Sequence, residues 1–248
     1  MTKEEINAHP MKSYEGPIHV IRRPEQIERA VKQLEKETVL GFDTETRPTF
    51  RVGEYYPPAI LQLVGEKAAY IFQLRHCRLS PALLGLLANP RIVKAGVALD
   101  RDVQELNKLA AFSPAGFVDV AKLVKWAGYM NHGLRGLATV LLGFRISKRA
   151  QTSNWDRATL TRAQIEYAAT DAWVGRELYR KLQELLPEMT ADEPATNDWE
   201  PGPNPQMSEV EKPKPRNPKR ARRTKAPNST RPARRRRDAK RKRTPPGP

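Results

Sequence analysis

The segment Val39-Leu40-Gly41-Phe42-Asp43-Thr44-Glu45-Thr46 decides how the rest of this 248-residue chain is interpreted. It follows a helical stretch, begins as an apolar run and ends with two carboxylates separated by one residue, which predicts a buried strand. Because side chains alternate faces along a strand, Asp43 and Glu45 point to the same side. Carboxylates this close repel each other, and a hard divalent cation such as Mg²⁺ removes that repulsion. The alternative is the polar end of an ordinary strand, with both acids in water.

The segments around this strand predict an α/β fold. Two apolar runs, at 59–64 and 68–72, are joined by a short turn and predict a hairpin, so that three antiparallel strands start a mixed central sheet. Helix and strand segments alternate after them, which predicts helices packed on the sheet. The other predicted elements are strands at 18–21, 92–97 and 117–118 and helices at 24–34, 79–88, 100–109, 119–127, 134–142 and 161–186.

Composition excludes several classes of protein. No run of about 18 apolar residues is present, so no membrane-spanning helix is expected, and the segment from Met1 to Tyr14 lacks the apolar core of an export signal. The single cysteine, Cys77, excludes an internal disulfide and a cysteine-based zinc site.

Charge divides the chain into three parts. Residues 1–190 carry a net charge of +6, residues 191–211 carry −6, and residues 212–248 carry +16 from 17 Lys and Arg against one Asp. After Pro187 the chain is rich in proline and poor in large apolar residues, so it cannot bury enough surface to fold, and we expect disorder there. The predicted organisation is a lead-in at 1–17, a folded domain at 18–187, an acidic, proline-rich linker at 188–211 and a disordered basic tail at 212–248.

Further acids occur at two later positions. Asp102 lies in the first turn of the helix that follows strand 92–97, where Asp100, a candidate N-cap, competes for the same role. The alternative for Asp102 is a first-turn acid that complements the helix dipole. Tyr167 and Asp171 are four residues apart and therefore share one face of the last helix, although a surface tyrosine with Asp171 paired to an arginine fits the same spacing.

If these acids meet in the folded chain, they have a chemistry in common. Four carboxylates from a strand, a helix start and a late helix can hold two divalent cations, Mg²⁺ or Mn²⁺, that clamp the attacking and leaving oxygens of a phosphodiester. A phenol beside them would orient the attacking water.

These motifs together resemble the DEDDy-type 3′–5′ exonuclease domain family, to which ribonuclease D and the Werner-syndrome exonuclease domain belong. The resemblance is carried by Gly41-Phe42-Asp43-Thr44-Glu45-Thr46, by the Asp102 segment and by Tyr167-Ala168-Ala169-Thr170-Asp171-Ala172, in the order of the family's three motifs. Supporting stretches are Pro58-Ala59-Ile60-Leu61-Gln62-Leu63, Lys94-Ala95-Gly96-Val97 and Ser153-Asn154-Trp155. The short, stand-alone architecture is similar to that of bacterial members.

The resemblance implies a ribonuclease-H-like fold and an exonuclease that releases mononucleotides from the 3′ end of DNA or RNA by a two-metal-ion mechanism. It implies that the metal ligands are Asp43, Glu45, Asp102 and Asp171, with Asp102 favoured over Asp100, and that Tyr167 orients the water. The implied substrate-binding residues are Thr44, Gln62, Lys148 and Trp155, of which Trp155 fits a packing role equally well. The implied partner is the 3′ end of a single-stranded or recessed nucleic acid, with no membrane. The runner-up is a non-catalytic nucleic-acid-binding protein that retains the fold.

The basic tail is the second functional feature. Its densest runs are Arg234-Arg235-Arg236-Arg237 and Lys240-Arg241-Lys242-Arg243. A disordered polycation binds phosphate backbones without sequence preference, so we expect the tail to tether the protein to its substrate or to a ribonucleoprotein. Nuclear targeting and simple solubilisation fit the same composition. The expected location is the cytoplasm, or the nucleus if the host is eukaryotic.

Overall fold

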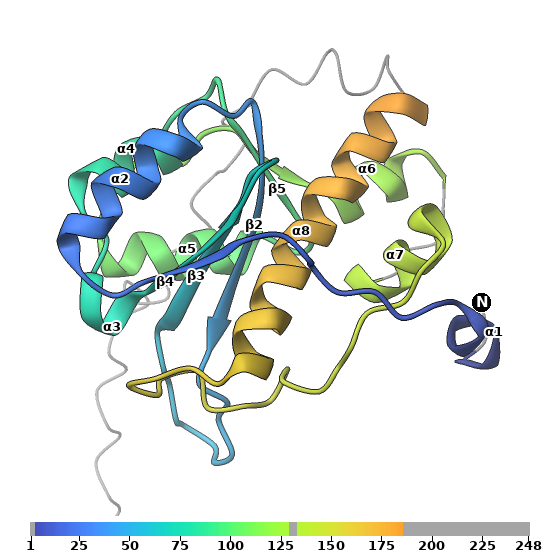
Figure 1. The fold of residues 1–248 in the computed structure, drawn as a ribbon, viewed down its shortest axis with the longest axis horizontal. Helices are drawn as coiled ribbons and strands as arrows, with labels where there is room; N and C mark the ends of the chain where they lie inside the picture. Colours follow the sequence, from blue (N-terminus) through green and yellow to red (C-terminus); the bar gives the residue numbers. More distant parts are fainter. Residues whose placement is uncertain (1–2, 129–132, 186–248) are drawn as a thin grey trace, which may run out of the picture. The chain divides into compact units, whose positions relative to one another are not determined.

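The computed structural model describes residues 3–128 and 133–185, so the predicted linker and basic tail lie outside the described residues. The described part is a mixed sheet with helices packed on it (Figure 1). Its strands are β1 (Ile18–Ile21), β2 (Val39–Thr46), β3 (Pro58–Val64), β4 (Ala69–Gln73), β5 (Val93–Gly96) and β6 (Phe117–Asp119). Its helices are α1 (Lys3–Ala8), α2 (Pro24–Leu34), α3 (Leu74–Cys77), α4 (Pro81–Leu87), α5 (Asp100–Leu109), α6 (Val120–Trp126), α7 (Leu134–Leu142) and α8 (Arg162–Leu185). In these ranges, no helix is both long and apolar enough to cross a membrane.

The strands lie in the order β1-β4-β3-β2-β5-β6. Strands β2, β3 and β4 pair antiparallel, which confirms the predicted start of the sheet. Strand β1 joins the far edge in parallel with β4, and β5 and β6 extend the sheet from β2 in parallel. The carboxylate strand β2 therefore lies inside the sheet, where the antiparallel and parallel parts meet.

The two faces of the sheet are covered by different helices (Figure 1). Leu40, Phe42, Leu61 and Leu63 alternate onto one face and pack in a single core with residues of α2, α4 and α5. Ile60 and Val64 point to the other face and pack against α8. Strand β3 is buried along its whole length, which explains why every residue in it except Gln62 is apolar.

Helix α8 approaches the sheet unusually closely, and two glycines permit this approach. A Cβ atom on Gly41 of β2 would overlap the carbonyl oxygen of Ala172 in α8. A Cβ atom on Gly175 of α8 would lie 2.8 Å from the carbonyl oxygen of Ala95 in β5. Only hydrogen at these positions lets the backbones of helix and sheet come this near.

The bounds of most elements agree with the sequence predictions, and the exceptions have local causes. Helix α6 begins at Val120 because Asp119 is its N-cap, accepting a hydrogen bond from the Ala121 N–H at 3.0 Å. The expectation that Asp100 caps α5 was wrong, since the N-cap is Leu99 and Asp100 is the first helical residue. The short helices α1 and α3 were not predicted.

The predicted lead-in has a defined place in the fold. The N–H of Lys12 donates to the carbonyl oxygen of Arg145, and the N–H of Arg145 donates to the carbonyl oxygen of Pro10, both at 2.9 Å. The N–H of Tyr14 donates to the Thr170 hydroxyl at 3.0 Å. Residues 10–14 are therefore joined to the connection between α7 and α8 and to α8 itself.

Candidate metal centre

The centre is built where α8 crosses the end of β2. Asp43 and Glu45 share the face of β2 that Gly41 presents to α8, and Asp171 directly precedes Ala172, the residue in contact with Gly41. One carboxylate oxygen from each of Asp43, Glu45 and Asp171 lies within 4.8 Å of the other two. The pairing with β3 shifts register between Glu45 and Thr46, so the strand is irregular directly after the second acid.

Asp102 lies beside this group and is attached to it through β2. The hydroxyl of Thr44, between the two acids of β2, donates to Oδ1 of Asp102 at 2.5 Å. The charge of Asp102 is near enough to contribute to raising the pKa of both Asp43 and Glu45. Asp100 instead pairs with Lys122 at 2.7 Å, and its side chain is 61% exposed. The geometry thus favours Asp102 over Asp100.

The four carboxyl groups are electrostatically strained as they stand. Burial, followed by the neighbouring charges of Glu45, Asp171 and Asp102, raises the pKa of Asp43 well above its ordinary range. Burial and the charges of Asp171 and Asp102 raise the pKa of Glu45 to about 9. Burial raises the pKa of Asp171 to about 6 and also raises that of Asp102. The group therefore favours any partner that neutralises it.

The donor set fits a divalent cation. Oδ1 of Asp171 is buried and has no hydrogen-bond partner among the described residues, although buried polar atoms are normally paired. Carboxylate oxygens are the ligands that Mg²⁺ and Mn²⁺ prefer, and a cation would take up both this lone pair and the excess negative charge.

Tyr167 lies one helical turn before Asp171 and is buried. Its hydroxyl lies near enough to the Asp171 carboxylate for that group to contribute to raising the Tyr167 pKa. Burial and the charges of Asp171 and Glu45 raise its pKa, so the phenol stays protonated and acts as a hydrogen-bond donor. A cavity of about 150 Å³ opens beside these two residues and is also lined by Lys12, Ser13 and Arg149.

Arg135, in the first turn of α7, is a member of the site that the sequence did not reveal. Its Nη2 donates to the Tyr167 hydroxyl at 3.4 Å and to the carbonyl oxygen of Ser147 at 3.2 Å. Its charge lowers the pKa of Glu45, of Asp171 and of Tyr167, in opposition to the larger effect of burial. A lone arginine in a helix carries no spacing signal, so only the fold identifies it.

The four predicted substrate residues lie in different environments. Thr44 is bound to Asp102, as described above. Gln62 is fully buried, directly across from Asp43 in the sheet, and both polar atoms of its side chain lack partners among the described residues. Lys148 is exposed in the loop before α8, and in residues 3–128 and 133–185 its ammonium group has no ion-pair partner.

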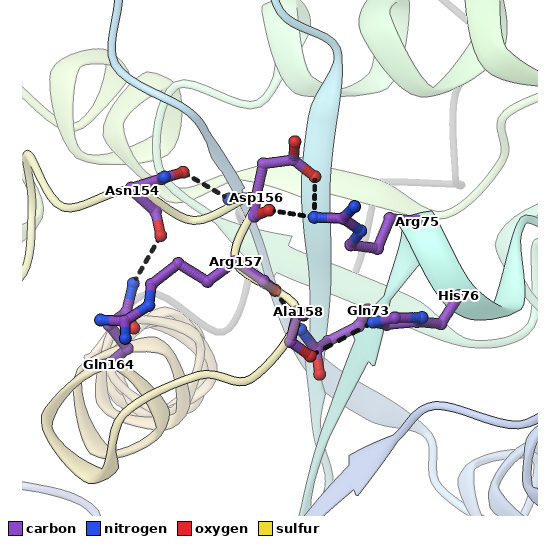
Figure 2. Close-up of polar contacts among 8 residues, drawn as sticks. All are labelled: Gln73, Arg75, His76, Asn154, Asp156, Arg157, Ala158 and Gln164. Carbon is purple, nitrogen blue, oxygen red and sulfur yellow. Dashed lines mark hydrogen bonds and ion pairs between the residues drawn. The ribbon is translucent and has the colours of Figure 1, made fainter.

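Trp155 lies behind the site. It is fully buried, with its ring centroid 5.8 Å from that of Tyr167. Figure 2 shows how the segment around it is held by the end of β4, by α3 and by α8. Gln73 donates to the carbonyl oxygen of Arg157 at 3.1 Å, His76 bonds that of Ala158 at 3.2 Å, and Gln164 donates to that of Asn154 at 3.0 Å. This environment supports a packing role for Trp155, which lies against the Tyr167 ring on its buried side.

We expect the metal-free protein to lose stability as the pH rises from about 5 to about 9. The pKa values of Asp43 and Glu45 are raised in the folded state, so the folded chain binds more protons than the unfolded chain in this window. The contribution is fully present below the unfolded pKa, 4.5 for Glu45, and is lost as the pH passes about 9. Urea unfolding in EDTA at several pH values measures the trend.

Added Mg²⁺ or Mn²⁺ should raise Tm, and more so at alkaline pH, because cations and protons compete for the same oxygens. Asp100→Asn is the matched control and should leave the pH trend unchanged. Stability that is flat with pH in EDTA, together with no response of Tm to either cation, would contradict the prediction.

The folded part of the chain is similar in sequence to known exonucleases and polymerases. A family model described as 3′-5′ exonuclease matches residues 18–187. DNA polymerase I of Aquifex aeolicus is 32% identical over 168 residues, 68% of this chain and 28% of the relative. Ribonuclease D of Haemophilus influenzae is 30% identical over 173 residues, 67% of this chain and 41% of the relative. The chain thus spans well under half the length of these relatives.

The fold has counterparts among solved structures. The crystal structure of the Aedes aegypti Nibbler EXO domain superimposes with a TM-score of 0.64 at 21% identity, covering 73% of this chain and 94% of that one. This likeness confirms the predicted ribonuclease-H-like arrangement of a mixed sheet flanked by helices.

Proposed function

Because this chain belongs to the 3′–5′ exonuclease family, we propose that it hydrolyses phosphodiester bonds at the 3′ end of a nucleic acid and releases mononucleotides. The observation that carries the proposal is the meeting of Asp43, Glu45 and Asp171 within 4.8 Å, with an unpartnered buried oxygen on Asp171. Single-stranded or recessed 3′ ends are the proposed substrates.

The proposed metal ligands are Asp43, Glu45, Asp102 and Asp171. Two bound Mg²⁺ or Mn²⁺ ions would supply charge neutralisation, an activated water and stabilisation of the leaving 3′-oxygen. Thr44 fixes Asp102 by its hydrogen bond, and its backbone would lie beside the terminal nucleotide. The residues themselves therefore serve to hold, space and orient the reacting groups.

Tyr167 is the proposed orienting group for the attacking water. Its raised pKa keeps the phenol neutral, so it donates a hydrogen bond and does not abstract a proton. Arg135 donates to the phenol oxygen from the other side, which leaves the phenol's own hydrogen to point toward Asp171 and the reacting centre. Gln62 and Lys148 remain proposed substrate-binding residues, with Gln62 directly across from Asp43. For the fully buried Trp155, the packing role is the one we propose.

An assay with 5′-labelled DNA and RNA strands, resolved on gels, tests the proposal. Progressive shortening from the 3′ end in Mg²⁺ or Mn²⁺, abolished by EDTA, is the expected result. Both DNA and RNA strands are tested because the relatives include a DNA polymerase and a ribonuclease. Tight binding without shortening on either strand would instead support the non-catalytic alternative.

Replacing Arg135 by alanine should lower kcat about 10- to 100-fold with little change in KM, because the Tyr167 phenol loses the group that holds it. Guanidinium ion added to Arg135→Ala should restore part of the rate by occupying the vacated space. Arg180→Ala, at an exposed position of α8, is the control. Unchanged kcat, or equal recovery with sodium chloride, would remove Arg135 from the site.

The basic tail is proposed to tether the enzyme to phosphate backbones and so raise the local substrate concentration. Deleting residues 191–248 should weaken binding at low salt and flatten the dependence of affinity on salt, since most of the net charge is removed. Affinity that does not change on deletion would leave targeting or solubilisation as the role of the tail.

A further inference from the structure

The loop between β2 and β3 exposes aromatic side chains next to arginines. Phe50 is 83% exposed and Tyr55 is 57% exposed. Tyr56 is half-buried, and the guanidinium of Arg47 lies 4.5 Å from the centre of its ring. Exposed aromatic rings placed among cations are a common feature of surfaces that bind single-stranded nucleic acids, because bases stack on the rings and cations bind the phosphates.

A groove of about 430 Å³ runs beside this loop. Its floor is apolar and includes Pro58, Ala59 and Leu74, and three arginines line it: Arg47, Arg75 and Arg78. Arg75 is paired with Asp156 at 3.5 Å, as Figure 2 shows. The other two arginines have no carboxylate partner within the described ranges, so their charges are available to a ligand. We refer to this feature as the arginine–aromatic groove.

The groove begins where the carboxylate strand ends. Arg47 follows Glu45 by two residues, and Thr46 pairs with Pro58, which lines the groove. A strand whose 3′ end reached the acids would need a path for its upstream nucleotides, and this groove lies next to the site.

We propose that the arginine–aromatic groove binds upstream nucleotides of a single-stranded substrate whose 3′ end is at the metal centre. The inference rests on the exonuclease function proposed above. Arg47 and Arg78 bind phosphates, since guanidinium groups match phosphate geometry, and Tyr56 stacks on a base. An acidic peptide is the competing ligand. It would bind the arginines through its carboxylates and would not need a base-stacking contact with the Tyr56 ring.

Two variants each remove one side-chain group of the groove, and loss of the Tyr56 ring also removes its contact with Arg47. Arg78→Gln removes a charge whose side chain has no polar partner in residues 3–128 and 133–185, so no internal bond is lost. Tyr56→Leu keeps an apolar side chain but removes the ring. The matched control is Arg180→Gln, an exposed arginine of α8. None of these residues belongs to the proposed metal centre.

Initial rates are measured on a single strand of about 12 nucleotides and on a trinucleotide with the same 3′ end. For each variant, KM on the longer strand should rise about fivefold to tenfold while kcat and the trinucleotide kinetics stay unchanged. For Arg78→Gln, the slope of log affinity against log salt should fall by about 0.7. The control should match the wild type on both substrates.

Unchanged KM on the longer strand would overturn the inference. Equal losses on both substrates would also overturn it, because a trinucleotide at the metal centre is too short to reach upstream contacts. A loss with Arg78→Gln but none with Tyr56→Leu would also overturn it in favour of a purely ionic ligand. If the wild type shortens no strand, the exonuclease proposal fails. Fluorescence anisotropy with the longer strand in EDTA then still tests the groove, since the same two variants must weaken binding.

Discussion

The Asp43→Asn variant is expected to lose at least about 10³-fold in the rate of 3′ shortening. Asp43 lies within 4.8 Å of Glu45 and Asp171, and replacing one anionic ligand removes several kcal/mol of cation binding and of transition-state stabilisation. Each 1.36 kcal/mol corresponds to about a factor of ten in rate. Gel assays at saturating Mn²⁺ measure the loss.

The same variant should be more stable than the wild type in EDTA at pH 8. Asp43 is a buried carboxyl group whose pKa is raised by burial and by three neighbouring acids, so an uncharged amide relieves repulsion. Lost activity combined with a raised Tm separates a missing ligand from a misfolded protein. Asp100→Asn, at an exposed acid paired with Lys122, should change neither quantity appreciably. Activity near the wild-type level in Asp43→Asn would refute the role of this site.

The second large effect is expected from Gly41→Ala. The added methyl group would overlap the carbonyl oxygen of Ala172, and a backbone atom of a helix packed on a sheet cannot move aside alone. We expect a loss of about 3 kcal/mol or more in the free energy of unfolding, at the upper end for overpacking. The rate of 3′ shortening should fall as well, since Asp171 directly precedes Ala172 and would move with the displaced helix backbone.

Gly85→Ala provides the matched comparison. Gly85 lies inside α4, and a Cβ atom there would meet nothing within 4 Å. Because alanine favours helices more than glycine does, the free energy of unfolding of this variant should rise by about 0.5 to 1 kcal/mol. Urea unfolding of the two variants measures the contrast, and equal effects would show that the approach of α8 to β2 does not depend on Gly41.

Much of this arrangement could be predicted from local patterns. The apolar runs of β2, β3 and β4 and the short turn between the last two predict an antiparallel start to the sheet, because strand periodicity and turn residues are local signals. The pairing of Asp43 with Glu45 on one face follows from the period of a strand, and that of Tyr167 with Asp171 from the period of a helix.

Other features depend on contacts between distant segments and carry no local signal. The contacts that favour Asp102 over Asp100 come from Thr44, 58 residues before Asp102, and from Lys122, 22 residues after Asp100. Arg135 joins the site only because α7 packs against α8 beside Tyr167. The register of the lead-in against Arg145 likewise requires the folded domain.

The lead-in has a consequence for any shortened form of this protein. Residues 10–14 lie before the family match, which starts at residue 18, yet the Tyr14 N–H is bound to Thr170, the neighbour of Asp171. A protease that trimmed the N-terminus back to residue 18 would spare all four acids of the candidate metal centre and every strand. It would nevertheless remove the hydrogen bond to Thr170 of α8, and it would take Lys12 and Ser13 from the wall of the cavity beside Tyr167. A trimmed chain of this kind would retain its sheet while α8, the helix that carries Tyr167 and Asp171, lost an anchor.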